Sequence, residues 1–572
     1  MKYELIAPID KKLNIVEQVF KNRGIQDIEH YLNTTDEDLL DPMLLDNMRE
    51  GAQMLIKHIS AGNQIFVMVD SDCDGYTSSA LLLNYLNKVF PYNTQANIAY
   101  ALHEGKQHGI KEEAIPKGTK LIIAPDSSSN EFSLHQRLRE YGIDILVLDH
   151  HEAHWQSEDA CVINNQLCDY PTKSLSGVGI VYKFCSYLDS LLGTNYAEDL
   201  VDLAALGIIA DVMPLTDYET KRIIDKGIAN IKNPFFKGMT IKNAFSLGSE
   251  ITPFGIAWYI APYINAITRS GTMEEKLLTF EAMLEYKAYE EIPSTKRGCK
   301  GQFETRVEQA VRTCGNVKNR QGKITDTDMD TINHLISQYG LLDHRIILVQ
   351  LDRSHKTSLA GLIANKLMGE YQRPTLILTQ TEQAGEKWWE GSFRAPKALD
   401  FKDFCIESKL VEYAEGHQQA GGVGIKDCNI EAFRLYCEEH LKDIDLTPNY
   451  KVDKIYNGKS LVEETDDFYS LMSYGNIWGQ GVEEPDLAME SLVITKDNII
   501  LMKGTTLKIT CGDISFIKFK SNEQEYEALY PNDGVTMINV IFNCKKNEWG
   551  GKVTPQLIIK DYEITNRMEY YF

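Results

Sequence analysis

Residues 65–75 read IFVMVDSDCDG, a short apolar run followed at once by three aspartates and a glycine. The run is too short for a buried helix and is rich in β-branched residues, so it predicts a strand. Two similar runs follow, KLIIA at 120–124 and ILVL at 145–148, and amphipathic stretches such as TSSALLLNYLNKVF separate the three. Because strands that alternate with helical stretches are typical of βαβ units, we predict a parallel sheet here.

The patterns outside this sheet divide the chain into further regions. Residues 1–60 show short amphipathic helical patterns, residues 61–215 hold the predicted parallel sheet, and residues 216–340 are mostly helical in pattern. A second cycle of strands and helices, with strands at HRIILVQLD and PTLILT, fills residues 341–445. Alternating polar and apolar residues, broken by Gly, Asn and Asp, predict a small antiparallel barrel or sandwich at 446–572. The predicted fold class is α/β with a β-rich C-terminal domain.

The composition disfavours several classes of protein. The 572 residues carry 59 basic and 82 acidic side chains, which gives a formal net charge of −23. Proteins that coat nucleic acid by neutralising phosphates are normally basic, although solubility alone accounts for most of this acidity. We expect no membrane contact, because no apolar run is long enough to cross a bilayer and MKYELIAPIDKKLN lacks the apolar core of a secretory signal. Eleven cysteines without a CxxC pair favour reduced thiols and a cytoplasmic location.

Acidic residues and histidines cluster close to the ends of the predicted strands, where ligands bind in open parallel sheets. Each cluster alone has an ordinary explanation. A DxDxDG string also occurs in calcium loops and turns, a lone Asp after a strand is more often a helix cap, and paired histidines are usually solvated or buried in a core. Together they are hard to attribute to caps, because carboxylates beside a core repel one another unless they are paired. The residues are Asp70, Asp72, Asp74, Asp126, Asp149, His150, His151 and Asp211.

This mixture of side chains indicates which metal it would bind. Carboxylate oxygens with one or two imidazoles suit Mn²⁺ or Mg²⁺ better than a structural zinc ion. Two such ions, about 3.5–4 Å apart, can clamp the attacking and leaving oxygens of a phosphoryl displacement. We therefore predict a site for two Mn²⁺ or Mg²⁺ ions and chemistry on a phosphoester.

At these motifs the chain resembles the DHH phosphoesterase superfamily. The similar segments are VDSDCDGYTSSALL, Asp126, LVLDHH and ALGIIADVMPL. Within the superfamily the chain resembles RecJ, the single-strand-specific 5′→3′ DNA exonuclease, through SGVGIVYKF and IAPYINAITRSG. HKTSLAGLIANKL, GSFRAP and EGHQQAGG resemble the associated DHHA1 domain, and YGNIWGQGVEEPDLA and WGGKVTPQLIIKDYEI resemble the flanks of the RecJ OB-fold. The resemblance covers essentially the whole chain.

The resemblance implies a domain for each region. It implies an N-terminal helical segment at 1–60, a DHH domain at 61–215 and a helical linker at 216–340. A DHHA1 domain is expected at 341–445 and an OB-fold-like domain at 446–572.

The resemblance also implies roles for single residues. It implies Asp72, Asp74, Asp126, His150 and Asp211 as metal ligands, with Asp126 as the bridge and Asp70 as support for the first ion. His151 is expected to face the scissile phosphate, and Asp149 to orient an imidazole. The substrate-binding positions that it implies are Ser392, Arg394, Gly416, His417, Asn265, Arg269 and His103.

Three positions depart from the family pattern. Met68 stands where many DHH enzymes carry a histidine, Tyr263 stands where an arginine is frequent, and His103 stands where an arginine often contacts the 5′-phosphate. Recognition of the 5′ end is therefore expected to differ, while every core metal ligand is present.

The expected activity is release of nucleoside 5′-monophosphates from the 5′ end of single-stranded DNA, threaded between the DHH and DHHA1 domains, in DNA repair and recombination. A single-strand-binding protein or a helicase is the expected protein partner. One alternative is a DHH phosphodiesterase for short oligoribonucleotides or cyclic dinucleotides, which the length and the last 120 or so residues disfavour. A second alternative is a scaffold that only binds partners, which the complete acidic set disfavours.

Overall fold

The computed structural model describes residues 1–105, 107–353, 359–383, 385–459, 461–531, 534–549 and 551–569. The chain divides into two compact units: Met1–Glu4 with Asn319–Lys451, and Leu5–Lys318 with Val452–Phe572. Among these described residues, no helix is both long and apolar enough to span a bilayer. The predicted α/β class, with two α/β domains and a β-rich C-terminal domain, is confirmed.

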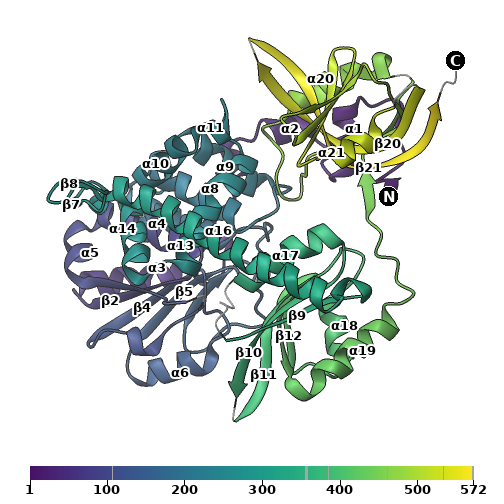
Figure 1. The fold of residues 1–572 in the computed structure, drawn as a ribbon. Helices are drawn as coiled ribbons and strands as arrows, with labels where there is room; N and C mark the ends of the chain where they lie inside the picture. The colour runs from purple at the N-terminus through teal and green to yellow at the C-terminus, as the bar shows by residue number, and fades with distance from the viewer. Residues whose placement is uncertain are drawn as a thin grey trace. The chain divides into compact units, whose positions relative to one another are not determined.

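The larger unit contains a five-stranded, fully parallel sheet, whose strands β2, β4 and β5 are labelled in Figure 1. The three predicted strands are present as β2, β4 and β5. Two edge strands, β3 and β6, were not predicted, because IAYAL is mostly half-buried and CVIN spans only four residues. The spatial order is β3 (Ile98–Leu102), β2 (Gln64–Val69), β4 (Thr119–Pro125), β5 (Asp144–Asp149) and β6 (Cys161–Asn164).

Helices cover both faces of this sheet. Ile65, Val67 and Val69 belong to the core that β2 shares with α3 (Met48–Ser60), α4 (Cys73–Val89) and α7 (Gly177–Leu192). Phe66 and Met68 lie in a second core with Leu138 of α6 (Phe132–Glu140). Figure 1 shows α6 on the opposite side of the sheet from α3. Burial on both faces explains why these strands are uniformly apolar rather than alternating.

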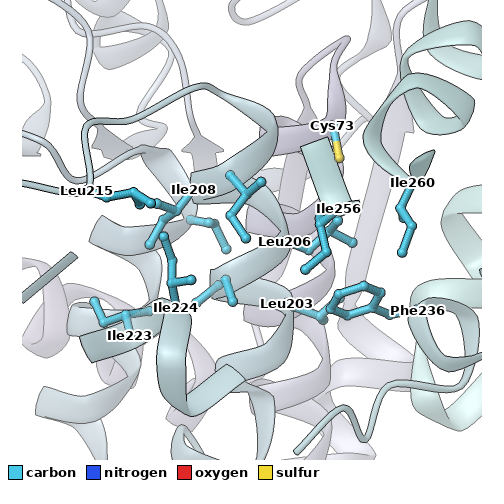
Figure 2. Close-up of a cluster of buried hydrophobic side chains, with 14 of the residues drawn as sticks. Cys73, Leu203, Leu206, Ile208, Leu215, Ile223, Ile224, Phe236, Ile256 and Ile260 are labelled. Atoms are coloured by element: carbon cyan, nitrogen blue, oxygen red, sulfur yellow. The ribbon is translucent and has the colours of Figure 1, made fainter. Parts of the chain in front are cut away.

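Helix α8 (Val201–Ala210) is buried on almost every side. Figure 2 shows Leu203, Leu206 and Ile208 of this helix in one apolar cluster with side chains of the helical region that follows. Asp211 comes directly after α8, so this packing fixes where its carboxylate lies. The helices that follow are α9 (Tyr218–Ala229), α10 (Pro234–Lys242), α11 (Ala244–Leu247), α12 (Pro253–Tyr259), α13 (Ala261–Ser270), α14 (Met273–Met283), α15 (Glu285–Ala288) and α16 (Arg306–Gln338).

A seven-stranded sheet fills the C-terminal part of the larger unit, and N-terminal residues pack against this part. Helix α1 (Ile15–Asn22) contacts α20 (Thr465–Met472), and α2 (Ile28–Leu32) follows α1 (Figure 1). Arg23 donates two hydrogen bonds, of 2.8 and 2.9 Å, to the buried Asp453 carboxylate. The strand order is β15 (Lys454–Asn457), β16 (Leu487–Ile494), β20 (Gly534–Trp549), β21 (Lys552–Glu569), β19 (Ile514–Phe519), β18 (Thr506–Cys511) and β17 (Ile499–Met502).

The smaller unit contains a second five-stranded sheet with apolar cores on both faces. Strands β9 and β10 are parallel and the other neighbours are antiparallel. Its helices include α17 (Ala360–Tyr371), which begins just after the described residues resume at 359; the predicted motif residues 355–358 lie outside them. The strand order is β12 (Tyr413–His417), β13 (Ala420–Lys426), β11 (Glu386–Arg394), β10 (Thr375–Gln383) and β9 (Ile347–Leu351).

Candidate metal centre

Acidic and imidazole side chains converge at the carboxyl edge of the parallel sheet. Their potential ligand atoms form three overlapping groups, and within each group all atoms lie within 4.8 Å of one another. Asp126 and His150 each belong to two groups, so they join the three into one cluster. The groups are Asp70 with Asp72 and Asp126; Asp74 with His150 and Asp211; and Asp126 with Asp149, His150 and His151.

The turn from β2 into α4 positions the first carboxylates. Asp72 is the N-cap of α4, and its Oδ1 accepts a hydrogen bond of 3.0 Å from the backbone N–H of Gly75. Asp74, in the first turn of the same helix, accepts bonds from Ser176 Oγ at 3.0 Å and from the Gly177 N–H at 2.7 Å. The amino end of α7 therefore holds the Asp74 carboxylate in place.

Asp126 is held by strand pairing and by a close helix. Its backbone N–H donates to the Leu148 carbonyl at 2.8 Å, and its φ of 64° is left-handed, a region that Asp and Asn enter more readily than most residues. A Cβ added to Gly177 would lie 2.3 Å from Asp126 Oδ1. Only glycine therefore allows α7 to begin against this carboxylate.

Asp149 orients the ring of His151. Asp149 Oδ1 accepts bonds from His151 Nδ1 at 2.7 Å and from the His150 N–H at 2.8 Å, and Oδ2 accepts a bond from the Ser129 N–H at 3.0 Å. Burial acts to raise the pKa of Asp149, but its bond with His151 and the neighbouring imidazoles lower this pKa overall. The same bond raises the pKa of His151 to about 9, so this ring is positively charged near neutral pH.

The electrostatics of the cluster fit a divalent cation. Burial raises the pKa of Asp74 to about 7 and that of Asp211 to about 8, and neighbouring carboxylates add to both shifts. Burial also lowers the pKa of His150 to about 4, so its ring is neutral, as a metal ligand must be. Asp126 Oδ1 and Asp211 Oδ2 are buried and make no hydrogen bond to the residues that the structure describes. His150 Nε2 lies 3.3 Å from Asp126 Oδ1 and 3.5 Å from Asp211 Oδ2, and hard oxygens beside a neutral imidazole are donors that suit Mn²⁺ or Mg²⁺.

Asp70 is paired with a histidine that the sequence did not single out. The Asp70 carboxylate accepts bonds from His108 Nδ1 at 2.6 Å and from the Gly109 N–H at 3.3 Å. His103, a predicted substrate residue, follows β3 in a buried position, and its Nε2 lies 4.0 Å from Asp70 Oδ1. Burial lowers the pKa of the His103 ring. No motif marks His108, which lies in a loop 38 residues from Asp70.

Asn265 and Arg269 lie one turn apart on α13. This helix packs against α4 and α8, two of the helices that border the cluster. Arg269 is exposed, whereas Asn265 Oδ1 is buried and makes no hydrogen bond within the described ranges. The pair therefore presents one free acceptor and one exposed cation on this helix.

The other predicted substrate residues share one sheet in the smaller unit. Ser392 lies opposite Gly422, and Arg394 lies opposite Ala420. On the other side of β13, Gly416 lies opposite Gly421 and His417 opposite Ala420, so β13 separates the strand of Gly416 and His417 from the strand of Ser392 and Arg394. A Cβ at Gly361, near the start of α17, would lie 2.9 Å from Arg394 Nη2 and 3.5 Å from Ser392 Oγ. Both side chains therefore point toward the first turn of α17.

Comparison with known proteins places the chain among nucleases. Residues 64–208 match the DHH family, N-terminal domain, and residues 460–561 match the RecJ OB domain. YorK, an SPbeta prophage-derived protein of Bacillus subtilis (strain 168) that carries the name of a single-strand DNA-specific exonuclease, is 36% identical, and the match covers 100% of both chains. RecJ of the same organism, named as a single-stranded-DNA-specific exonuclease, is 24% identical over 99% of this chain and 71% of its own.

A solved structure shares the fold. RecJ of Thermus thermophilus, in complex with Mn²⁺, superposes with a TM-score of 0.73 at 18% sequence identity. The match covers 98% of this chain and 77% of that one.

Proposed function

The chain belongs to the RecJ family of the DHH phosphoesterase superfamily, and on this basis we propose that it is an exonuclease for single-stranded DNA. We propose further that it works from the 5′ end, releases nucleoside 5′-monophosphates and needs two Mn²⁺ or Mg²⁺ ions. The observation that carries the proposal is the cluster of buried carboxylates and one neutral imidazole at the sheet edge. The names of the relatives support single-stranded DNA as the substrate.

The three groups of the cluster support the ligand roles that the resemblance implies. Asp72, Asp74, Asp126, His150 and Asp211 would hold the ions, with Asp126 between them and Asp70 as support. When bound, the ions polarise the phosphoryl group and the attacking water and neutralise the charge that develops. The chain's own contribution is to hold these oxygens at fixed positions through the bonds of Ser176, Gly177 and Gly75.

We assign His151 to the scissile phosphate. Asp149 binds Nδ1, so Nε2 of the charged ring is left to donate a hydrogen bond. A fixed cationic donor stabilises the negative charge that builds up on phosphoryl oxygens in the transition state. Asp149 is a positioning residue, because it acts through this ring.

The substrate roles concern two sets of residues. In the smaller unit, Ser392 and Arg394 would contact the DNA backbone, since a guanidinium offers two parallel donors to a phosphate. Gly416 and His417 belong to the same sheet, one strand further along, and would bind the same DNA strand. In the larger unit we assign Asn265, Arg269 and His103 to the nucleotide at the 5′ end.

We also propose a cellular role. Activity on single strands fits DNA repair and recombination, in which a single-strand-binding protein or a helicase would supply the strand. Cytoplasmic action is part of the proposal, and the eleven cysteines, which are all free thiols, support it.

The direct test uses single-stranded DNA labelled at either end, with Mn²⁺, and the same DNA as a duplex for control. Early release of the 5′ label as a mononucleotide supports the proposal, and early release of the 3′ label contradicts the direction. Turnover restricted to short RNA would favour a small-substrate phosphodiesterase instead. Asp126→Ala and His150→Ala should abolish turnover while the protein still binds DNA. Arg394→Ala should mainly raise KM.

A further inference from the structure

Trp155 exposes a large aromatic surface next to the candidate metal centre. It lies in the loop after β5, four residues beyond His151, and 63% of the residue is exposed. Four residues of extended chain span at most about 14 Å. The backbone of Trp155 therefore lies within about 14 Å of that of His151, the residue assigned to the scissile phosphate.

Phe132 supports the indole. The two ring centroids are 6.0 Å apart, and the ring planes are inclined by only 28°. Phe132 is the first residue of α6, which begins shortly after Asp126, and Trp155 follows Asp149–His151. Both rings thus belong to segments that leave the same edge of the sheet as the metal-centre residues.

Hydrogen bonds fasten the Trp155 loop. Asn130 Nδ2 donates to the Glu152 carbonyl at 2.8 Å, and Asn164 Nδ2 donates to the His151 carbonyl at 2.9 Å. On the far side, His135 Nδ1 and Ser157 Oγ are 3.0 Å apart. Because the loop is held on both sides of Trp155, binding a ligand there would order few additional groups.

The chemistry of the loop indicates a nucleobase rather than a phosphate. Residues 152–159 read EAHWQSED and contain three acidic residues and neither lysine nor arginine, so the segment would repel the DNA backbone. His154 and Gln156, which flank Trp155 in the chain, are polar, so the segment is not a continuous apolar stretch of the kind that binds proteins. The π-face of the indole remains as the binding surface.

We propose that Trp155, supported by Phe132, is a stacking platform for one nucleobase of the single-stranded substrate, close to the scissile phosphate. This inference rests on the proposed exonuclease function and adds a binding site to it. Stacking accepts every base, because each base has a π-face, so the platform suits an enzyme that degrades DNA of any sequence.

The test combines a protein variant with a substrate variant. Trp155→Ala should raise KM for single-stranded DNA roughly 5- to 150-fold, which is the effect of losing the stacking of one base on an aromatic ring. Trp155→Phe should retain most of the affinity. For the wild type, an abasic site at the platform position should raise KM similarly, whereas for Trp155→Ala the same abasic site should have little further effect.

Tyr141→Ala is the matched control. Tyr141 is 71% exposed, lies in the same domain and follows α6 toward the amino end of β5, at the opposite edge of the sheet. Its removal should leave KM unchanged. The proposal is refuted if Trp155→Ala leaves KM unchanged. It is also refuted if, at every tested position, the abasic site raises KM by the same factor in Trp155→Ala as in the wild type.

A binding measurement separates this inference from the proposed function. Fluorescence anisotropy of labelled oligonucleotides without metal should show the same loss for Trp155→Ala and the same non-additivity with the abasic site. If DNA binds in this way but Mn²⁺ produces no cleavage, the exonuclease proposal fails and the platform stands. If the wild type and Trp155→Ala bind the oligonucleotides equally well, or if neither binds them, the proposal of a stacking platform is overturned.

Discussion

Lys183 and Glu219 form an ion pair that is almost completely removed from water. Lys183 Nζ lies 2.7 Å from Glu219 Oε1, and the two side chains are only 3% and 1% exposed. The same carboxylate accepts bonds from the Tyr170 hydroxyl and from the Leu40 N–H. One buried charge thus joins α7, α9 and the N-terminal segment.

Lys183→Met should lower the free energy of unfolding by about 3–5 kcal/mol, because it leaves the Glu219 charge buried without its partner. Urea unfolding followed by circular dichroism measures the loss. Lys232→Met is the control, since it breaks an exposed pair with Asp199 and should cost less than about 1 kcal/mol. If the two variants lose similar amounts of unfolding free energy, burial does not make the Lys183–Glu219 pair more important than the exposed pair.

Asp126→Asn should stabilise the metal-free protein and abolish its response to metal. The variant removes a buried carboxylate that other carboxylates repel, and Asn keeps the left-handed φ of 64°. Each kcal/mol gained would raise Tm by about 1 °C, because the larger unit is long and its unfolding entropy is correspondingly large. Thermal unfolding with and without Mn²⁺ checks this. If Mn²⁺ raises the Tm of the variant as much as that of the wild type, Asp126 is not a metal ligand.

Asp149→Asn should lower kcat by about a hundred-fold or more, because the amide cannot accept all the bonds that now fix the His151 ring. KM should change little. In a His151→Ala background the same substitution should add almost nothing, since Asp149 acts through that ring. Steady-state kinetics of the two single variants and the double variant provide the measurement, and additive losses would assign Asp149 a separate role.

The hairpin of β7 (Glu291–Pro293) and β8 (Phe303–Thr305) should loosen in acid. Arg312 donates two bonds of 2.6 Å to the Glu304 carboxylate and lowers the pKa of Glu304 to about 2, from an ordinary value of 4.5. Because the folded-state pKa is the lower one, this stabilisation is complete above about pH 4.5 and is lost as the pH falls toward 2.

Hydrogen exchange of residues 291–305, corrected for the intrinsic effect of pH, should show this loss of protection. Glu304→Gln should show it already at neutral pH. If the protection of these residues from exchange in the wild type stays constant between about pH 4.5 and pH 2, Glu304 does not stabilise the hairpin in this way.

The central strands of the fold could be predicted because their signal is local. A run such as IFVMV, buried on both faces, differs clearly from the amphipathic helices around it. Strand β3 could not be predicted, since its residues are mostly half-buried and show neither a continuous apolar run nor alternation. Strands β7 and β8, of three residues each, are too short to form a pattern.

The sequence revealed the carboxylates and histidines of the cluster, but not the groups that hold them. Aspartates directly after strands could be placed at one sheet edge, because parallel strands end there together. The bonds of Ser176 to Asp74 and of His108 to Asp70 join segments that are distant in sequence. Such contacts depend on how helices and loops pack, which no local spacing encodes.

The bond between Arg23 and Asp453 also affects how the protein is made. A ribosome that adds about 5–20 residues per second needs roughly 20–90 seconds to reach Asp453 after Arg23, 430 residues earlier. During that time the apolar face of α1, including Val19 and Phe20, has no C-terminal domain to cover it. The first helix therefore receives this cover only late in synthesis, and a product terminated before residue 453 is expected to leave the helix more open to proteolysis.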